Sequence, residues 1–158
     1  MARIILLSIV LSIIYSSDAF SGGAPPTVCD DMTPVHLVGP KTSKLPYNVT
    51  VDRSEVKGGE IVEISIQGSY KGVLVEVRNG KKAAGTFIVS SDDRFVKTID
   101  CHGSKKNALT HKNSFTKKDK TFKWKAPRIP GKYTVMVTVV KEALTFWARK
   151  PTAVINVV

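Results

Sequence analysis

The chain has 158 residues, of which 24 are Lys or Arg and 13 are Asp or Glu, so its formal net charge is +11. Its hydrophobic fraction of 42% argues against a disordered chain, which combines low hydrophobicity with high charge. Two cysteines are too few for a disulfide-dense small scaffold or a four-cysteine zinc module. The composition therefore predicts one basic globular domain.

Residues 1–19 have the pattern of a secretory signal peptide. Arg3 supplies a short positive region, residues 4–15 form an apolar run, and Ser17-Asp18-Ala19 places small residues where signal peptidase cleaves. The competing interpretation is a membrane anchor, but this run has only about 12 residues, whereas a spanning helix needs about 20. We therefore predict cleavage after Ala19, a secreted chain 20–158 that forms a single domain, and no transmembrane segment.

A secreted chain folds in an oxidising compartment, which bears on two further features. Cys29 and Cys101 are the only cysteines, so we expect them to form a disulfide. The competing hypothesis is a catalytic or metal-binding thiol, which a secreted chain rarely keeps. Asn48-Val49-Thr50 is an N-glycosylation sequon after a Pro46-Tyr47 turn, so Asn48 is a candidate glycan site.

Apolar residues alternate with polar ones from residue 61 onward, which is the pattern of half-buried strands. In residues 61–67, three alternate residues are apolar and share one face. In residues 73–78 three valines do the same, and Glu76 and Arg78 are expected to point away from the core. Further strand candidates are residues 86–90, 95–100, 121–125, 133–139 and 152–158.

Turn residues punctuate these runs, for example Lys57-Gly58-Gly59, Asn79-Gly80 and Ser91-Asp92-Asp93. Residues 41–45 and 103–120 are predicted to be long loops. About seven or eight short strands in about 110 residues predict an all-β fold, an immunoglobulin-like antiparallel β-sandwich.

Residues 105–132 form a basic block with ten cations and one acid, so they hold nine of the eleven net charges. Alternation in residues 121–125 directs Lys123 and Lys125 outward, beside the predicted loop, so we expect one basic patch. Such a patch serves either as a solvated face or as a site that attracts polyanions. The candidate ligand-binding residues are Lys105, Lys106, Lys112, Lys117, Lys118, Lys120, Lys123, Lys125 and Arg128.

Secretion limits the classes of polyanion that such a patch would meet. Nucleic acid is disfavoured because a secreted protein seldom encounters it and because Phe122 and Trp124 fit the core better than a base-stacking surface. Lys outnumbers Arg in the block, which suits diffuse attraction rather than bidentate recognition. The favoured partners are microbial envelope polyanions, such as lipopolysaccharide and teichoic acids, or acidic lipids and glycans.

The chain lacks the motifs of the common enzyme classes: there is no G-x-S-x-G elbow, no H-E-x-x-H and no phosphate loop. The histidines are His36, His102 and His111, and their spacing does not favour a metal site with Asp100. Asp92-Asp93 could bind calcium only weakly. We therefore expect no enzyme activity, no cofactor and no metal.

Several motifs in order resemble those of a reeler (reelin N-terminal) domain. At the start, Ser21-Gly22-Gly23-Ala24-Pro25 leads to Cys29 and then to Met32-Thr33-Pro34-Val35-His36. The resemblance continues almost to the end of the chain, through residues 45–47, 70–78, 85–87, Cys101 and residues 109–111, 122–127 and 131–133. One departure is Val73, where the family often has an aromatic residue after Lys-Gly.

A solitary reeler domain behind a signal peptide is similar to the insect defense proteins, which are secreted immune proteins of the haemolymph. The resemblance implies an immunoglobulin-like sandwich, a Cys29–Cys101 disulfide and antibacterial defence by surface binding, with haemocytes as further candidate partners. It carries over no catalytic residues. The alternative function is an extracellular adhesive module that binds host cells or matrix.

Overall fold

The computed structural model describes residues 20–34 and 38–158, so the predicted signal peptide and His36 lie outside the described residues. A single 3₁₀ turn, η1 (Pro26–Val28), precedes eleven strands in this part of the chain. One sheet has the order β1 (Asn48–Val51), β3 (Ile61–Tyr70), β9 (Lys117–Lys125) and β6 (Thr86–Ile88). The other has the order β2 (Glu55–Val56), β11 (Thr145–Val157), β10 (Gly131–Glu142), β4 (Gly72–Asn79), β8 (Ser104–His111) and β7 (Val96–Cys101), with β5 (Lys82–Ala83) paired to β4.

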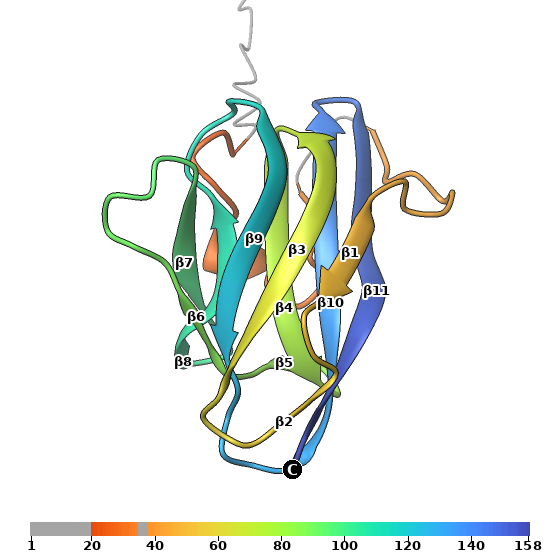
Figure 1. Ribbon diagram of the computed structural model, residues 1–158. Coiled ribbons are helices and arrows are strands. Elements are labelled where there is room, and N and C mark those ends of the chain that lie inside the picture. Colours follow the sequence, from red (N-terminus) through yellow and green to blue (C-terminus); the bar gives the residue numbers. More distant parts are fainter. Residues whose placement is uncertain (1–19, 35–37) are drawn as a thin grey trace, which may run out of the picture.

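The two sheets pack face to face as a β-sandwich, which confirms the predicted fold class (Figure 1). All strand pairs are antiparallel except β2 with β11. The core between the sheets takes the alternate residues that the sequence pattern predicted, including Val62, Ile64 and Ile66 of β3, all with 0% exposure. Trp124 of β9 is also fully buried and its ring lies 6.0 Å from that of Tyr133 on β10.

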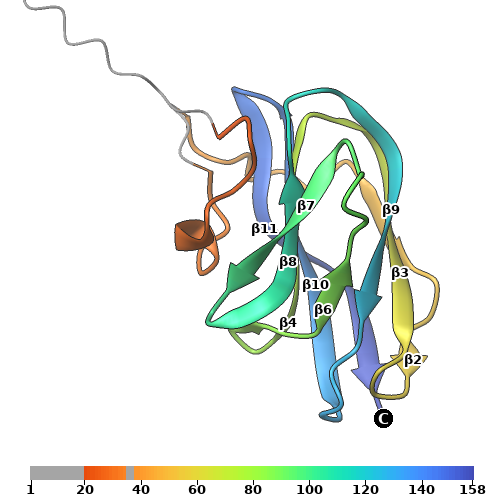
Figure 2. The same cartoon turned by 90° about the vertical axis from the view of Figure 1, so that its left-hand side faces the viewer.

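We call the sheet that contains β4, β8, β10 and β11 the large sheet and the other the small sheet. Residues 20–34, the N-terminal segment, cover the outer face of the large sheet (Figure 2). Cys29 and Met32 of this segment form a second apolar cluster with Leu74 of β4 and Ala108 of β8. As a result, β4 is buried on both faces from Gly72 to Arg78. Glu76 and Arg78 point away from the core between the sheets, as predicted, but they are buried because the side of β4 opposite the core lies beneath this segment.

Four of the described strands were not predicted: the short β1, β2 and β5, and β8, because residues 103–120 are not one long loop. They contain β8 and the start of β9. The sequence of β8 lacks clear alternation, since Asn107 is polar yet fully buried. Its amide donates to the carbonyls of Ala83 and Cys101 and accepts from the Cys101 N–H, so local hydrogen bonds replace apolar packing.

The connections gather at the two ends of the sandwich. The β3–β4, β8–β9 and β10–β11 connections lie together at one end, and the β9–β10 connection lies at the other end beside the C-terminus (Figure 1). We call the first of these ends the β8–β9 end. No helix in residues 20–34 and 38–158 has the length and apolar character required to span a membrane.

Candidate functional site

The central part of the basic block lies on β9, as its alternation predicted. Phe122 and Trp124 are buried in the core, whereas Lys123 and Lys125 are exposed on the outer face of the small sheet. Lys118 is exposed nearer the start of the same strand. We call Lys118, Lys123 and Lys125 the β9 lysines.

The neighbours of the β9 lysines are only partly basic. Lys123 lies opposite Glu63 of β3, so one acid faces it across the sheet. Lys125 lies opposite Ile61, which is 39% exposed. The outer face of the small sheet therefore combines cations with an acid and an apolar side chain.

Lys117 does not belong to the exposed surface, and the expectation that it forms part of a basic patch was wrong. Its side chain is fully buried, and Nζ donates to the carbonyls of Lys71 at 2.8 Å, Asn113 at 2.7 Å and Phe115 at 2.8 Å. Burial, together with the nearby charge of Lys120, lowers the pKa of Lys117 to about 8. At pH 7 the group is still mostly protonated, so it can serve all three carbonyls.

Lys120 and Lys112 hold neighbouring segments in place. The Lys120 ammonium lies 4.3 Å from the centre of the Phe95 ring, a cation–π contact. Lys112 Nζ donates to the Asp93 carbonyl at 2.6 Å. Both lysines therefore pack against the connection between β6 and β7.

The remaining cations of the block lie elsewhere on the molecule. Lys105 and Lys106 are at the start of β8 in the large sheet, where Lys105 Nζ pairs with Asp100 at 2.7 Å. This hydrogen bond and the opposite charge raise the pKa of Lys105. Arg128 is exposed in the β9–β10 connection. The block is thus divided between two sheets and both ends of the sandwich, and the expectation of one continuous patch was wrong.

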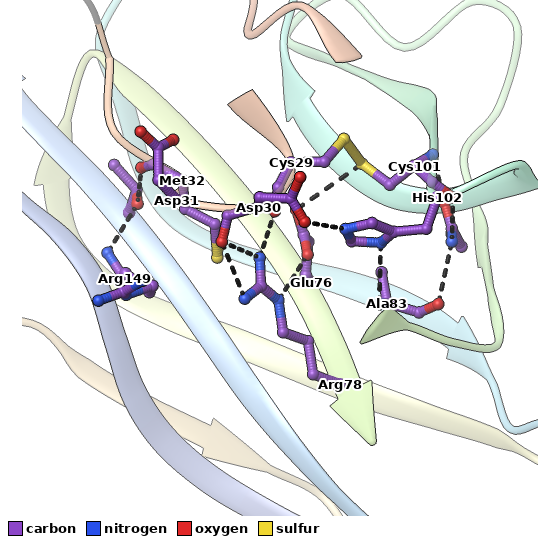
Figure 3. Close-up of polar contacts among 12 residues, drawn as sticks. Cys29, Asp30, Asp31, Met32, Glu76, Arg78, Ala83, Cys101, His102 and Arg149 are labelled. Atoms are coloured by element: carbon purple, nitrogen blue, oxygen red, sulfur yellow. Dashed lines mark hydrogen bonds and ion pairs between the residues drawn. A yellow bond between two sulfur atoms is a disulfide. The ribbon is translucent and has the colours of Figure 1, made fainter. Parts of the chain in front are cut away.

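The covered face of the large sheet holds a buried polar cluster that the sequence did not reveal (Figure 3). Cys29 and Cys101 form a disulfide across 72 residues, which links the N-terminal segment to β7. On a chain-entropy argument, closure of such a loop stabilises the fold by about 4 kcal/mol. Arg78 extends towards this disulfide, and its guanidinium donates to the carbonyls of Cys29 and of Asp30, the latter at 3.2 Å.

Glu76 completes the cluster as the counter-charge of Arg78. Its Oε2 lies 2.7 Å from Arg78 Nε, and the exposed fractions of the two side chains are 0% and 7%. Burial raises the pKa of the Glu76 carboxyl, and Arg78 opposes this change. The pair is an internal clamp for the N-terminal segment rather than a site open to a ligand.

The two described histidines have structural partners. His102 Nδ1 accepts from the Ala83 N–H at 3.2 Å, and its Nε2 lies 3.1 Å from Asp30 Oδ1. His111 Nδ1 accepts from the Val73 N–H, and its Nε2 lies 3.0 Å from the Phe20 carbonyl oxygen. His36, the third histidine, lies outside the described residues.

One group of potential metal ligands occurs in the described part of the chain. It consists of Cys29, Glu76 and Cys101. The two sulfurs are joined in the disulfide, so they cannot act as thiolate ligands.

Asn48 lies on edge strand β1, where its side chain is exposed. Its amide donates to Gln67 Oε1 at 2.9 Å. The position is accessible, and glycan attachment at Asn48 stays a prediction.

The family model of the Reeler domain matches residues 27–158, which is most of the chain. The chain belongs to the reeler family. The motifs that run from Cys29 to residues 131–133 are therefore those of a true reeler domain.

Curated relatives match this reeler domain along nearly their whole length. "Putative defense protein 1" of Antheraea mylitta is 37% identical, and the match covers 94% of this chain and 93% of that protein. "Putative defense protein" of Bombyx mori is 36% identical, with 90% and 88% covered. A defense protein of Drosophila melanogaster is 31% identical, with 99% of each chain covered.

Solved structures agree on the fold. The human F-spondin reeler domain matches with a TM-score of 0.59, over 75% of this chain and 91% of that one, at 14% identity. A second F-spondin structure, of its Reelin-N domain, gives a TM-score of 0.60 at 12% identity. The reeler sandwich is thus retained at low sequence identity.

Proposed function

We propose that this reeler domain is a secreted innate-immune protein that binds anionic components of microbial surfaces through the β9 lysines. The observation that carries the proposal is the display of Lys118, Lys123 and Lys125 on a chain of net charge +11. The named relatives support a role in defence. The predicted signal peptide and the disulfide are consistent with an extracellular site of action.

The chemistry of this surface favours diffuse attraction. Exposed ammonium groups on flexible stems attract anions without a fixed geometry, which suits a repetitive polyanion with variable phosphate positions. Phe122 and Trp124, the aromatic residues of β9, are buried and cannot stack on nucleic-acid bases. Lipopolysaccharide and teichoic acids are accordingly the proposed ligands.

We propose binding rather than catalysis as the activity. In the described part of the chain, His102 and His111 are both held by backbone groups or by Asp30. The buried Glu76 carboxylate is paired with Arg78. These side chains therefore account for the fold, and none is presented as an acid, base or nucleophile at an open site.

The experiment compares two variants with the same change in net charge. In the first, the β9 lysines are replaced by Gln. In the control, Gln replaces the exposed Lys82 and Lys132 of the large sheet and the exposed Lys81 of the β4–β5 turn. Affinity for immobilised lipopolysaccharide and lipoteichoic acid is measured at low salt. We expect the first variant to lose about tenfold or more, equivalent to about 1.4 kcal/mol, and the control to lose less than about threefold.

Each other outcome has a definite meaning. Equal losses in both variants would show that net charge, not the β9 surface, attracts the ligand. Unchanged binding of the β9 variant would reject the proposal and favour an adhesive module, which a parallel assay on host cells and matrix would detect.

A further inference from the structure

A cavity of about 240 Å³ lies between the N-terminal segment and the outer face of the large sheet. Its walls are mainly apolar. Leu74 and Val140 line it from the sheet, and Ala24, Val28 and Met32 line it from the N-terminal segment. None of these side chains belongs to the β9 lysines or to the Glu76–Arg78 pair.

The polar groups along the inner wall are already satisfied. Thr138 Oγ1 donates to the Met32 carbonyl at 2.6 Å and accepts from the Arg149 N–H at 2.9 Å. Both ring nitrogens of His111 also have partners: Nδ1 accepts from the Val73 N–H, and Nε2 lies within hydrogen-bond distance of the Phe20 carbonyl oxygen. A water inside this space would find few partners, so an apolar occupant is favoured.

The lining of the cavity extends to the β8–β9 end, where two of its residues are each followed by an exposed apolar residue. Ser114 lines the cavity, and the next residue, Phe115, is 67% exposed. Ala143 also lines it, and the next residue, Leu144, is 58% exposed. Phe115 belongs to the β8–β9 connection and Leu144 to the β10–β11 connection, and these two connections lie at the same end of the sandwich (Figures 1 and 2).

The exposure of Phe115 is imposed by the fold. The buried ammonium of Lys117 binds the carbonyls of Asn113 and Phe115 within the β8–β9 connection and that of Lys71 in the β3–β4 connection. A buried cation is costly unless it is fully hydrogen-bonded, so the Lys117 ammonium keeps these carbonyls in place and fixes the shape of the loop. The chain thus exposes a large apolar side chain to water next to a residue that lines an apolar cavity.

Two exposed lysines, which we call the rim lysines, lie at this end of the cavity. Lys71 lines the cavity, and Lys141 follows Val140, which also lines it. One acid, Glu142, also lines the cavity. An anionic headgroup at the rim would therefore meet an excess of positive charge.

We infer that the cavity binds the acyl chain of an anionic amphiphile, with its headgroup at the rim lysines and with Phe115 and Leu144 in contact with neighbouring lipid chains. The inference rests on the proposed function only for the anionic headgroup. The size fits one chain: apolar cavities of about 150 Å³ hold a benzene ring, and sites for drug-sized ligands start at about 300 Å³. Bacterial and host lipids share this chemistry.

The first test measures the affinity of the wild-type protein for alkanoates of increasing chain length, below their micelle concentrations. Each added methylene should raise the affinity about fourfold until the cavity is full, and the affinity should then level off. Val28→Trp, which fills the cavity, should abolish this binding. Thr27→Trp is the matched control, because exposed Thr27 is the neighbouring residue of η1 and does not line the cavity.

Affinity that is independent of chain length would overturn the inference. So would alkanoate binding that survives in a folded Val28→Trp variant. Since lysine replacement on β9 leaves the cavity intact, failure of this test with retained lipopolysaccharide binding would reject the acyl site and not the proposed function.

The second test addresses the exposed Phe115 and Leu144 and does not depend on the Val28→Trp variant. Phe115→Ser with Leu144→Ser should weaken binding to phosphatidylglycerol vesicles at least tenfold. Ile129→Ser is the control, because Ile129 is 72% exposed in the β9–β10 connection at the opposite end. An equal loss in both variants, or no loss in the Phe115→Ser, Leu144→Ser variant, would contradict the inference. Host-like phosphatidylcholine vesicles, which carry no net charge, separate the contribution of charge from that of lipid contact.

Discussion

Replacement of Arg78 by Met tests the buried clamp beneath the N-terminal segment. The change keeps an apolar stem but removes the guanidinium that pairs with Glu76 at 2.7 Å and donates to the Cys29 and Asp30 carbonyls. Removal of one partner from a buried ion pair costs about 3 to 5 kcal/mol. We therefore expect Arg78→Met to lower the free energy of unfolding by that amount at pH 7.

The remaining carboxylate gives this prediction a pH dependence with a definite sign. In the folded variant, burial still raises the pKa of Glu76, and the guanidinium that opposed this change is gone. A folded-state pKa above the unfolded value means that the stability contribution is present at low pH and is lost as the pH rises through the folded pKa. Arg78→Met should therefore be less destabilising at pH 5 than at pH 8.

The assay is urea unfolding with the disulfide intact, and it includes two further variants. Glu76→Leu combined with Arg78→Met should be more stable than Arg78→Met alone, because no buried charge is left unpaired. Arg94→Met, on an exposed arginine, should change stability by less than about 0.5 kcal/mol. A loss below about 1 kcal/mol for Arg78→Met, or a double variant no more stable than Arg78→Met alone, would refute the clamp.

Three further changes test other parts of the fold. Trp124→Ala should cost about 3 to 5 kcal/mol in urea unfolding, because the ring is fully buried and its Nε1 donates to a backbone carbonyl at 2.9 Å; a cost under about 1 kcal/mol would contradict its place in the core. Gly85→Ala should cost more than about 1 kcal/mol, since φ is +70° and the new methyl would lie 2.4 Å from the Trp124 indole; a thermal midpoint equal to wild type would count against this packing. Burial lowers the pKa of His111 below its ordinary 6.5, so the contribution of neutral His111 to stability is present above pH 6.5 and is lost as the pH falls through the folded-state pKa. His111→Gln should therefore make the free energy of unfolding less dependent on pH below 7.5, and an unchanged pH profile would disprove the burial of a neutral His111.

The sequence predicted the features that depend on strict alternation. Val62, Ile64 and Ile66 of β3 face the core, as do Phe122 and Trp124 of β9. One face of each strand was buried by the opposite sheet, so a period of two was sufficient evidence. The disulfide could also be predicted from the sequence, because the chain has only two cysteines.

Burial of the opposite face of the large sheet was not predictable from period alone. It depends on the N-terminal segment, which contains no strand and packs through Met32 and Cys29. A signal existed in Leu74, Ala108 and Met136, which are apolar at the positions that alternation assigns to solvent. Such residues on neighbouring strands indicate a sheet that is covered on both sides.

The division of the basic block followed from a different cause. A lysine is normally exposed, so Lys117 was assigned to the surface with its neighbours. The structure buries it because three carbonyls of two separate connections converge on its ammonium, and this convergence depends on tertiary contacts far apart in sequence. The alternation of Lys123 and Lys125, in contrast, is a local property of β9 and was predicted correctly.

The most direct test of the account is the salt dependence of lipopolysaccharide binding by the wild-type protein. Exposed charges are screened beyond about 8 Å at physiological ionic strength and beyond about 3 Å at 1 M salt. If the β9 lysines attract the ligand, the affinity should fall at least tenfold between about 0.05 M and about 0.5 M salt. An affinity that stays constant over this range would contradict recognition by charge.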